Sequence, residues 1–262
     1  MTVNTKDARN EPKKQLYHKA YNTILNLVRI DIPVMLVGPA GSGKNVCVKQ
    51  VADALGLNMY YVNNVSNEFK ITGFIDAGGR YNETEFYRAF KNGGIFFLDE
   101  IDSSDPSALI TLNAAISNGY FAFPHETINR HPNFRIIAAA NTWGHGMDFQ
   151  YVGRNTLDSA SLDRFATVAF DYDESLEKKL VPNKNAICFI WKARESAKKN
   201  GIRHVFSTRT MVYFDKMLKA RFDVKTIVQS VLLKGMSKDD VEVMTHDLLD
   251  LDDMYEKYNL VE

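Results

Sequence analysis

The stretch Leu36-Val37-Gly38-Pro39-Ala40-Gly41-Ser42-Gly43-Lys44-Asn45 decides how this chain folds. Gly38, Gly43 and Lys44 are spaced as in the G-x-x-x-x-G-K-[ST] pattern of phosphate-binding loops. The apolar run 34–37 before the loop predicts a strand, and residues 46–51 after it predict a helix. Glycine lets the backbone turn tightly with its N–H groups aimed inward, and the helix adds its positive N-terminal end. The stretch therefore predicts a polyphosphate site, and a glycine-rich turn without a ligand is the alternative.

The candidate binding residues are those of the loop and the start of the helix after it: Gly38, Pro39, Ala40, Gly41, Ser42, Gly43, Lys44, Asn45 and Val46. Lys44 is expected to reach the outer phosphates. Asn45 stands where the pattern has a Ser or Thr whose hydroxyl binds Mg²⁺. An amide oxygen can also bind a hard cation, but Mg²⁺ demands near-ideal octahedral geometry. Asn45 is therefore a candidate metal ligand that puts ordinary Mg²⁺ binding in question.

A second landmark is the run Ile95-Phe96-Phe97-Leu98-Asp99-Glu100, in which bulky apolar residues end in two acids. Continuous hydrophobicity of this length, with a helical pattern on either side, predicts a parallel strand covered on both faces. Two carboxylates at the end of a buried strand are costly to desolvate unless they have a role. Because ligands collect at the carboxyl ends of strands in α/β sheets, we expect Asp99 to hold Mg²⁺ and Glu100 to polarise an attacking water. A solvated strand end is the alternative.

These two landmarks resemble the Walker A and Walker B motifs of the AAA+ ATPases. The alternating segment 120–128 and the run Arg135-Ile136-Ile137-Ala138-Ala139-Ala140-Asn141 are similar to the hairpin and strand before sensor 1 in the MoxR-like, dynein-related (AAA_5-type) branch. The resemblance implies an α/β P-loop NTPase fold, a five-stranded parallel sheet sandwiched by helices, with a small C-terminal all-helical lid domain. It also implies ATP and Mg²⁺ as ligands, ATPase activity, and a homo-oligomeric ring that is usually a hexamer.

The resemblance assigns four catalytic residues, which are Glu100, Asn141, Arg164 and Arg209. Asn141 matches sensor 1, a side chain that orients the lytic water or touches the γ-phosphate. Arg164, in a Leu-x-Arg-Phe setting, matches the arginine finger that enters the neighbouring subunit's site, and Arg154 is the second candidate. Arg209 matches the sensor 2 arginine of the lid, in a first helical turn behind the N-cap Ser207 where a cation opposes the helix dipole. Surface positions for the arginines, and a capping role for Asn141, are the alternatives.

The composition is that of an ordinary globular protein, with 45% apolar and 24% charged residues among 262. Lys plus Arg and Asp plus Glu both number 32, so the zero net charge gives no footprint for nucleic acid or an anionic membrane. Cys47 and Cys188 lie in helix-like apolar settings, which predicts core residues in a reducing compartment. With no signal peptide and no stretch long enough to span a bilayer, we expect a cytoplasmic protein.

The sequence pattern divides the chain into three parts. Residues 1–16 are polar and are expected to form a flexible N-terminal segment. Residues 17–174 alternate strand and helix patterns, which predicts the nucleotide-binding core. Residues 175–262 carry helical patterns alone and predict the lid, with an acidic C-terminal segment.

The expected function is that of a MoxR-like AAA+ protein, an oligomeric ring that hydrolyses ATP to remodel a protein partner. Such proteins often work with a partner that carries a von Willebrand A domain. The aromatic stretch from Phe69 to Phe74 is a candidate for a loop that faces the pore of the ring. Two alternatives stay open: a DNA-associated AAA+ ATPase of replication or packaging, and a nucleotide-gated scaffold in which Asn45 makes hydrolysis weak.

Overall fold

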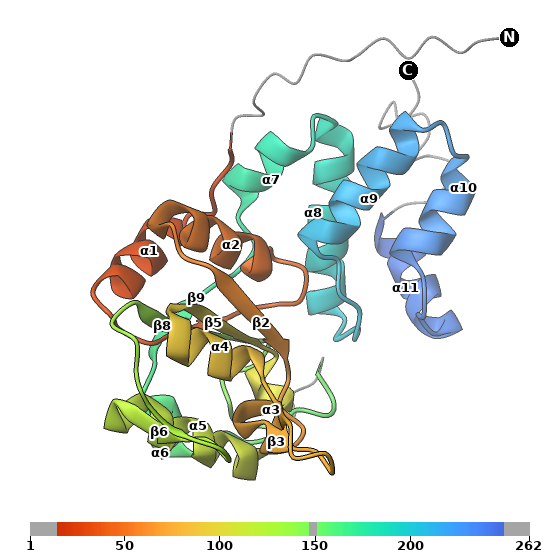
Figure 1. Ribbon diagram of the computed structural model, residues 1–262. Coiled ribbons are helices and arrows are strands. Elements are labelled where there is room, and N and C mark those ends of the chain that lie inside the picture. The colour runs from red at the N-terminus through yellow and green to blue at the C-terminus, as the bar shows by residue number, and fades with distance from the viewer. Residues whose placement is uncertain (1–14, 147–150, 249–262) are drawn as a thin grey trace, which may run out of the picture.

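The computed structural model describes residues 15–146 and 151–248 (Figure 1). The predicted flexible N-terminal segment and the end of the predicted acidic segment lie largely outside these residues. Within the described ranges, no helix is both long enough and apolar enough to cross a bilayer.

A parallel sheet of five strands forms the centre of the molecule, in the order β2-β5-β8-β1-β9. Its strands are β1 (Val34–Val37), β2 (Met59–Asn63), β5 (Gly94–Asp99), β8 (Phe134–Ala140) and β9 (Ala166–Ala169). The sequence analysis predicts β1, β5 and β8 by their residues, and the AAA+ resemblance implies the five-stranded parallel sheet that the structure shows. Val37 lies opposite Ala140 on one side and Ala169 on the other, so the loop after β1 leaves the sheet between two strand ends.

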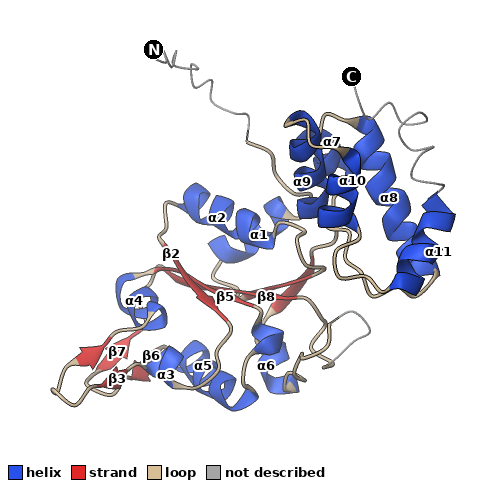
Figure 2. Ribbon diagram, turned by 90° about the vertical axis from the view of Figure 1, so that its right-hand side faces the viewer, coloured by secondary structure: helices blue, strands red, loops and turns tan. Residues whose placement is uncertain are grey.

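Helices cover both faces of the sheet because alternate residues of its buried strands point to opposite sides (Figure 2). Leu36, Phe97 and Ala139 pack with α1 (Tyr21–Arg29) and α2 (Lys44–Leu55). Val37, Leu98 and Ala140, one residue further along their strands, pack with α4 (Glu85–Asn92) and α5 (Pro106–Asn118). The sheet is therefore the middle layer of three, as predicted for a P-loop fold.

Two short hairpins project from the α4 and α5 side of the sheet (Figure 2). One consists of β3 (Phe74–Ile75) and β4 (Tyr81–Asn82) behind the single-turn helix α3 (Phe69–Thr72), and the other of β6 (Tyr120–Ala122) and β7 (Thr127–Asn129). The predicted alternating segment 120–128 is thus a hairpin. Phe69 begins α3 and Phe74 begins the first hairpin, and these aromatic residues of the expected pore loop are both about half exposed, at 55% and 49%.

After β9 and the short α6 (Ser159–Asp163) that precedes it, the chain is helical. The helices are α7 (Glu174–Leu180), α8 (Lys184–Lys199), α9 (Thr208–Lys219), α10 (Val224–Ile227), a π-helical turn (Val228–Leu232) and α11 (Lys238–Leu248). They enclose a separate apolar core and lie beside α2 (Figure 1). Cys47 is buried as predicted, but Cys188 is exposed because it lies on the outer face of α8, so its prediction as a core residue is wrong.

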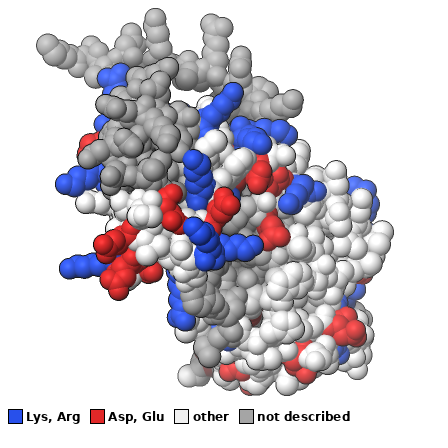
Figure 3. All heavy atoms as spheres, turned by 180° about the vertical axis from the view of Figure 1, so that it is seen from behind, with Lys and Arg blue, Asp and Glu red and all other residues white. Residues whose placement is uncertain are grey.

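Acidic and basic side chains alternate on the face of the molecule shown in Figure 3. Among the described residues visible on this face, neither sign gathers into one broad patch, which agrees with the balanced composition.

Candidate functional site

The loop between β1 and α2 is built on glycines that no other residue could replace without strain. A Cβ added to Gly38 would lie 2.1 Å from the carbonyl oxygen of Phe170, so the loop can pass this close to β9 only with glycine. Gly41 and Gly43 have φ angles of 71° and 102°, in the left-handed region that favours glycine. Gly43 is the N-cap of α2, and its missing side chain leaves open space in front of the helix.

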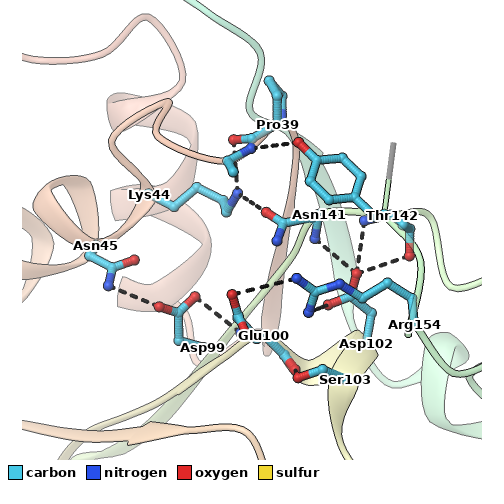
Figure 4. Close-up of polar contacts among 12 residues, drawn as sticks. Pro39, Lys44, Asn45, Asp99, Glu100, Asp102, Ser103, Asn141, Thr142 and Arg154 are labelled. Carbon is cyan, nitrogen blue, oxygen red and sulfur yellow. Dashed lines mark hydrogen bonds and ion pairs between the residues drawn. The ribbon is translucent and has the colours of Figure 1, made fainter. Parts of the chain in front are cut away.

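Lys44, the first residue of α2, is folded back over this loop (Figure 4). Its Nζ donates to the carbonyl oxygens of Gly38 (2.7 Å) and Pro39 (3.1 Å) and to Oδ1 of Asn141 (2.9 Å). The side chain is almost completely buried, and this burial lowers the pKa of Lys44 to about 8, although the nearby carboxylates of Asp99 and Asp102 act in the opposite direction. Lys44 is therefore a cation held by neutral oxygens that a stronger anionic acceptor could replace.

Ser42 supplies a second sign that the loop suits an anion. Its hydroxyl is buried and has no hydrogen-bond partner among the residues that the structure describes, which is unusual because a buried polar group without a partner is costly. Within the described residues, the backbone N–H groups of Gly41, Ser42 and Gly43 also donate to no protein acceptor. These donors surround the space in front of α2 and fit a phosphate group.

The end of β5 places Asp99 directly opposite the start of α2. Asn45 Nδ2 donates to Asp99 Oδ2 at 2.9 Å (Figure 4). The hydroxyl of Tyr61 donates to the same oxygen at 3.3 Å. Asn45 thus meets the carboxylate through its amide nitrogen. A half-turn of the amide would present its oxygen instead, so the pair can offer two hard oxygen ligands.

The donor set fits Mg²⁺ in its chemistry, because Mg²⁺ in nucleotide sites uses one or two carboxylates and takes its other ligands from phosphate and water. Within the described residues, no cluster of three or more His, Cys, Asp or Glu side chains offers a metal site formed by the protein alone. A cation here would therefore depend on oxygens from a bound polyphosphate.

Glu100 follows Asp99 in a left-handed backbone conformation, with φ of 52° and ψ of 44°. This conformation is costly for a residue with a side chain, and it turns the chain sharply into a single 3-10 turn, Ile101–Ser103. The turn directs Glu100 and Asp102 to the same arginine. Arg154 Nη2 lies 3.5 Å from Glu100 Oε1, and Arg154 Nη1 lies 3.2 Å from Asp102 Oδ1.

Asp102 is completely buried and fixes the residues around it. Its Oδ2 accepts hydrogen bonds of 3.0 Å from the backbone N–H groups of Asn141 and Thr142 and from the Thr142 hydroxyl (Figure 4). Asn141, at the end of β8, is thereby held with its side chain against Lys44. The structure thus brings Lys44, Asp99, Glu100 and Asn141 to one edge of the sheet.

The two candidates for the arginine finger, Arg154 and Arg164, lie in different places: Arg154 lies at the site and Arg164 away from it. Arg154 is the second candidate for a finger that enters a neighbouring subunit, but its side chain is only 12% exposed and its guanidinium lies against carboxylates of its own chain. Arg164 lies away from this edge, after α6, where it donates to the hydroxyl of Ser117 (3.1 Å) and to the carbonyl of Ala160.

A cavity of about 440 Å³ opens between the loop and the C-terminal helices. The residues that line it at the charged end are Ala40, Gly41, Ser42, Gly43, Lys44, Asn45, Val46, Asp99, Glu100, Asn141 and Arg209. Gly38 and Pro39 do not line it, and contribute through the carbonyl groups that hold Lys44. Arg209 is exposed in the first turn of α9, and within the described residues it makes no hydrogen bond or ion pair. Its N-cap Ser207 forms a capping box with Thr210, which confirms the predicted helix start.

The other end of the cavity is apolar and lies between the N-terminal segment and the C-terminal helices. Its lining residues are Leu16, His18, Leu176, Leu180 and Val212. His18 is buried, stacks on Phe170 at 3.8 Å between ring centroids, and contacts the Asp171 carbonyl (2.8 Å) and the Ala20 N–H (3.1 Å). Burial lowers the pKa of His18.

Sequence reasoning missed several residues of the site. It assigned no role to Asp102 or His18, because their partners lie far along the chain. Two tyrosines that hold the loop were also missed, since the hydroxyl of Tyr151 accepts from Ala40 N–H (2.9 Å) and that of Tyr172 donates to Ala40 carbonyl (3.1 Å). No local pattern marks these four residues.

Comparison with known proteins identifies the family of the chain. Residues 33–165 match the family described as AAA domain (dynein-related subfamily), which covers half of the chain. The chain belongs to this family, and its P-loop α/β fold and resemblance to the dynein-related branch are confirmed.

Curated relatives include an uncharacterized protein of Staphylococcus saprophyticus, 26% identical over 58% of this chain and 60% of that protein. An uncharacterized protein of Staphylococcus aureus is 28% identical over 60% of this chain and 63% of its own length. The chain spans less than two-thirds of the length of these relatives.

Among solved structures, NtrX from Brucella abortus superposes with a TM-score of 0.57 at 16% identity, over 94% of this chain and 60% of that one. A second structure of NtrX, in complex with ADP, gives 0.54 at 15% identity, over 91% of this chain and 58% of that one. At this identity the likeness shows a shared fold.

Proposed function

We propose that this chain binds ATP with Mg²⁺ in the cavity and hydrolyses it. The observation that carries the proposal is the position of Lys44. Its buried Nζ donates to carbonyl oxygens that a phosphate could replace. It lies between the Ser42 hydroxyl, which has no partner among the described residues, and the carboxylates at the end of β5. The phosphates of ATP would take the place of these carbonyls. The base would lie at the apolar end, and the ADP-bound structure of NtrX supports nucleotide as the ligand class.

Each residue has a role that follows from its place. Lys44 and the loop N–H groups hold the phosphates, and Asp99 with Asn45 holds Mg²⁺. When bound, Mg²⁺ neutralises charge on the phosphate oxygens. The Glu100 carboxylate accepts a proton from the attacking water, and Asn141 orients that water. Arg209 contacts the γ-phosphate from its own chain.

We further propose a homo-oligomeric ring, a hexamer by resemblance, in which Arg164 completes the site of the next subunit. Arg164 lies outside its own cavity, as an arginine that acts on a neighbour must. The residues from 175 onward would act as the lid. Helix α3 and the first hairpin, with exposed Phe69 and Phe74, would face the pore and handle a protein partner. A von Willebrand A domain protein is the partner class that we expect. If Phe74→Ala leaves substrate handling unchanged, the pore assignment is wrong.

The test is steady-state ATP hydrolysis in Mg²⁺ over a range of protein concentrations. We expect turnover per chain to rise with concentration, because Arg164 acts only in the assembled state, and to collapse in Glu100→Gln. Turnover that is independent of concentration would contradict the ring, and turnover that survives in Glu100→Gln would contradict the assigned base.

A second candidate function is favoured by one observation, the hydrogen bond from Asn45 to Asp99. If this bond persists when nucleotide is bound, Asp99 is less available to Mg²⁺, and the chain acts as a nucleotide-gated scaffold with weak hydrolysis. The variant Asn45→Thr restores the usual hydroxyl and separates the two functions. A large gain in turnover in this variant supports the scaffold, whereas an equal or lower turnover supports the ATPase.

A further inference from the structure

Glu177, on α7, is a completely buried carboxylate outside the predicted site. Its Oε2 accepts from Trp191 Nε1 (2.8 Å) and Arg194 Nη1 (2.9 Å), and its Oε1 accepts from Arg194 Nη2 (2.6 Å) and the Thr208 hydroxyl (2.6 Å). A buried carboxylate is tolerated only when its oxygens are satisfied in this way. Glu177 therefore ties together three helices, α7, α8 and α9 (Figure 1).

The cluster around Glu177 reaches the phosphate-binding loop at two points. The Arg194 guanidinium stacks on the ring of Tyr172, at 3.8 Å from its centroid, and the hydroxyl of Tyr172 donates to the Ala40 carbonyl at 3.1 Å. Burial raises the pKa of Tyr172, so this hydroxyl stays a donor. The second point is Gly41, where an added Cβ would lie 2.6 Å from the Ser207 side chain.

The first turn of α9 lies where these contacts meet. Thr208, held by Glu177, follows Ser207, which packs on Gly41, and precedes Arg209, which faces the cavity. The Arg209 side chain has no partner of its own within the described residues, so only the backbone of this turn fixes where its guanidinium starts. Any shift of the turn would move the guanidinium relative to the loop.

We propose that Glu177 is a positioning residue for Arg209, and that it acts through the Thr208 hydroxyl. It holds the first turn of α9 at the distance from the loop at which Arg209 can reach the outermost phosphate of a nucleoside triphosphate. This inference rests on the proposed ATP site. It adds that discrimination between the triphosphate and the diphosphate depends on a buried carboxylate that touches neither.

The experiment measures the dissociation constants of ADP and of the non-hydrolysable analogue AMP-PNP for the full chain, by titration calorimetry. The variants are Thr208→Val, which removes only the hydroxyl at nearly constant volume, Glu177→Gln, and Arg209→Ala. Tyr213→Phe is the matched control, because it removes a hydroxyl from an exposed side chain of the same helix. Urea unfolding of each variant reports whether it folds. If Glu177→Gln does not fold, the nucleotide affinities of Thr208→Val alone test the proposal.

We expect Thr208→Val to weaken AMP-PNP binding about tenfold and to leave ADP binding within about twofold, as Arg209→Ala does. The double variant Thr208→Val with Arg209→Ala should bind AMP-PNP no more weakly than Arg209→Ala alone, because both changes remove the same interaction. Equal losses for the two nucleotides, or additive losses in the double variant, would overturn the proposal. If the unchanged protein binds neither nucleotide, the proposed function itself fails, which is a different result.

Discussion

The two ends of the cavity each contain a buried base whose pKa is lowered by burial, but they hold it differently. Lys44 at the charged end donates hydrogen bonds to two loop carbonyls and an amide oxygen, which are neutral acceptors that a phosphate can replace. His18 at the apolar end faces a carbonyl that can only accept and an N–H that can only donate. The neutral imidazole satisfies both groups, so neither hydrogen-bond partner of His18 would be replaced by a ligand. The comparison shows that one end is built for changing partners and the other for fixed ones.

The largest expected effect separates the two ends by substitution. Lys44→Met should weaken ADP binding by about 100-fold or more, because at least two charge-assisted hydrogen bonds to phosphate are lost. It should not lower the free energy of unfolding, since a buried cation is replaced by a side chain that burial favours. Calorimetry and urea unfolding measure the two quantities. A loss of stability that accompanies the loss of affinity would show that the lysine is also a fixed structural group.

The ion pair of Arg154 and Asp102 lies next to the charged end and is a fixed contact. Substitution of Arg154, compared with substitution of Arg164, tests it. Arg154→Ala should lower the free energy of unfolding by about 3 kcal/mol, because it leaves the fully buried Asp102 without its cation. Arg164→Ala should change it by less than about 0.5 kcal/mol, while it abolishes turnover in the assembled state. Urea unfolding and hydrolysis assays on both variants give the contrast. Equal stability of the two variants would contradict the assignment of Arg154 to its own chain.

A pH titration should reveal the exchangeable lysine. Below about pH 8 Lys44 is already protonated, whereas above it the free protein must take up a proton to hold a phosphate. ADP affinity should therefore fall by up to about tenfold per pH unit from pH 8 to 10. Calorimetry at pH 9 in buffers of different ionisation enthalpy should detect proton uptake. Affinity that stays flat up to pH 10 would mean that the lysine keeps its ordinary pKa.

The smallest effect is expected at the fixed end. The lowered pKa of His18 means that the unfolded chain binds a proton more readily than the folded one, so His18 costs stability as pH falls below the ordinary value of 6.5. His18→Gln should make the unfolding free energy less dependent on pH between 5 and 6.5. His204, whose pKa burial also lowers, remains and should account for a residual slope. An unchanged slope would show that His18 is free to protonate in the folded state.

The sequence predicts the sheet and the charged end well, because both are written in local patterns. The apolar run before Asp99 predicts a buried strand, and the spacing of Gly38, Gly43 and Lys44 predicts the loop without reference to the rest of the chain. Before the sheet, the spacing of Tyr17, Tyr21, Ile24 and Val28 is that of a helix face, but α1 begins only at Tyr21, since Tyr17 is exposed and residues 19–20 form a turn.

Contacts between distant segments could not be predicted. Glu177 lies in the charged run Glu174-Ser175-Leu176-Glu177-Lys178-Lys179, which looks like a solvated helix face, yet its partners come from two later helices. Arg154 resembles a surface arginine until the left-handed turn at Glu100 brings Asp102 towards it. In both cases the partner of a charge is chosen by topology, which local periodicity does not encode.

The buried state of Lys44 also has a consequence for its reactivity. With a pKa of about 8, about a tenth of the molecules at pH 7 hold this side chain as a free amine, compared with a few in ten thousand for an ordinary lysine. A free amine is a nucleophile, so acylating reagents small enough to enter the cavity meet a deprotonated nitrogen here far more often than at a surface lysine. The chain thus has a reactive amine in its cavity, and a bound anion would suppress this reactivity because it favours the protonated form of Lys44.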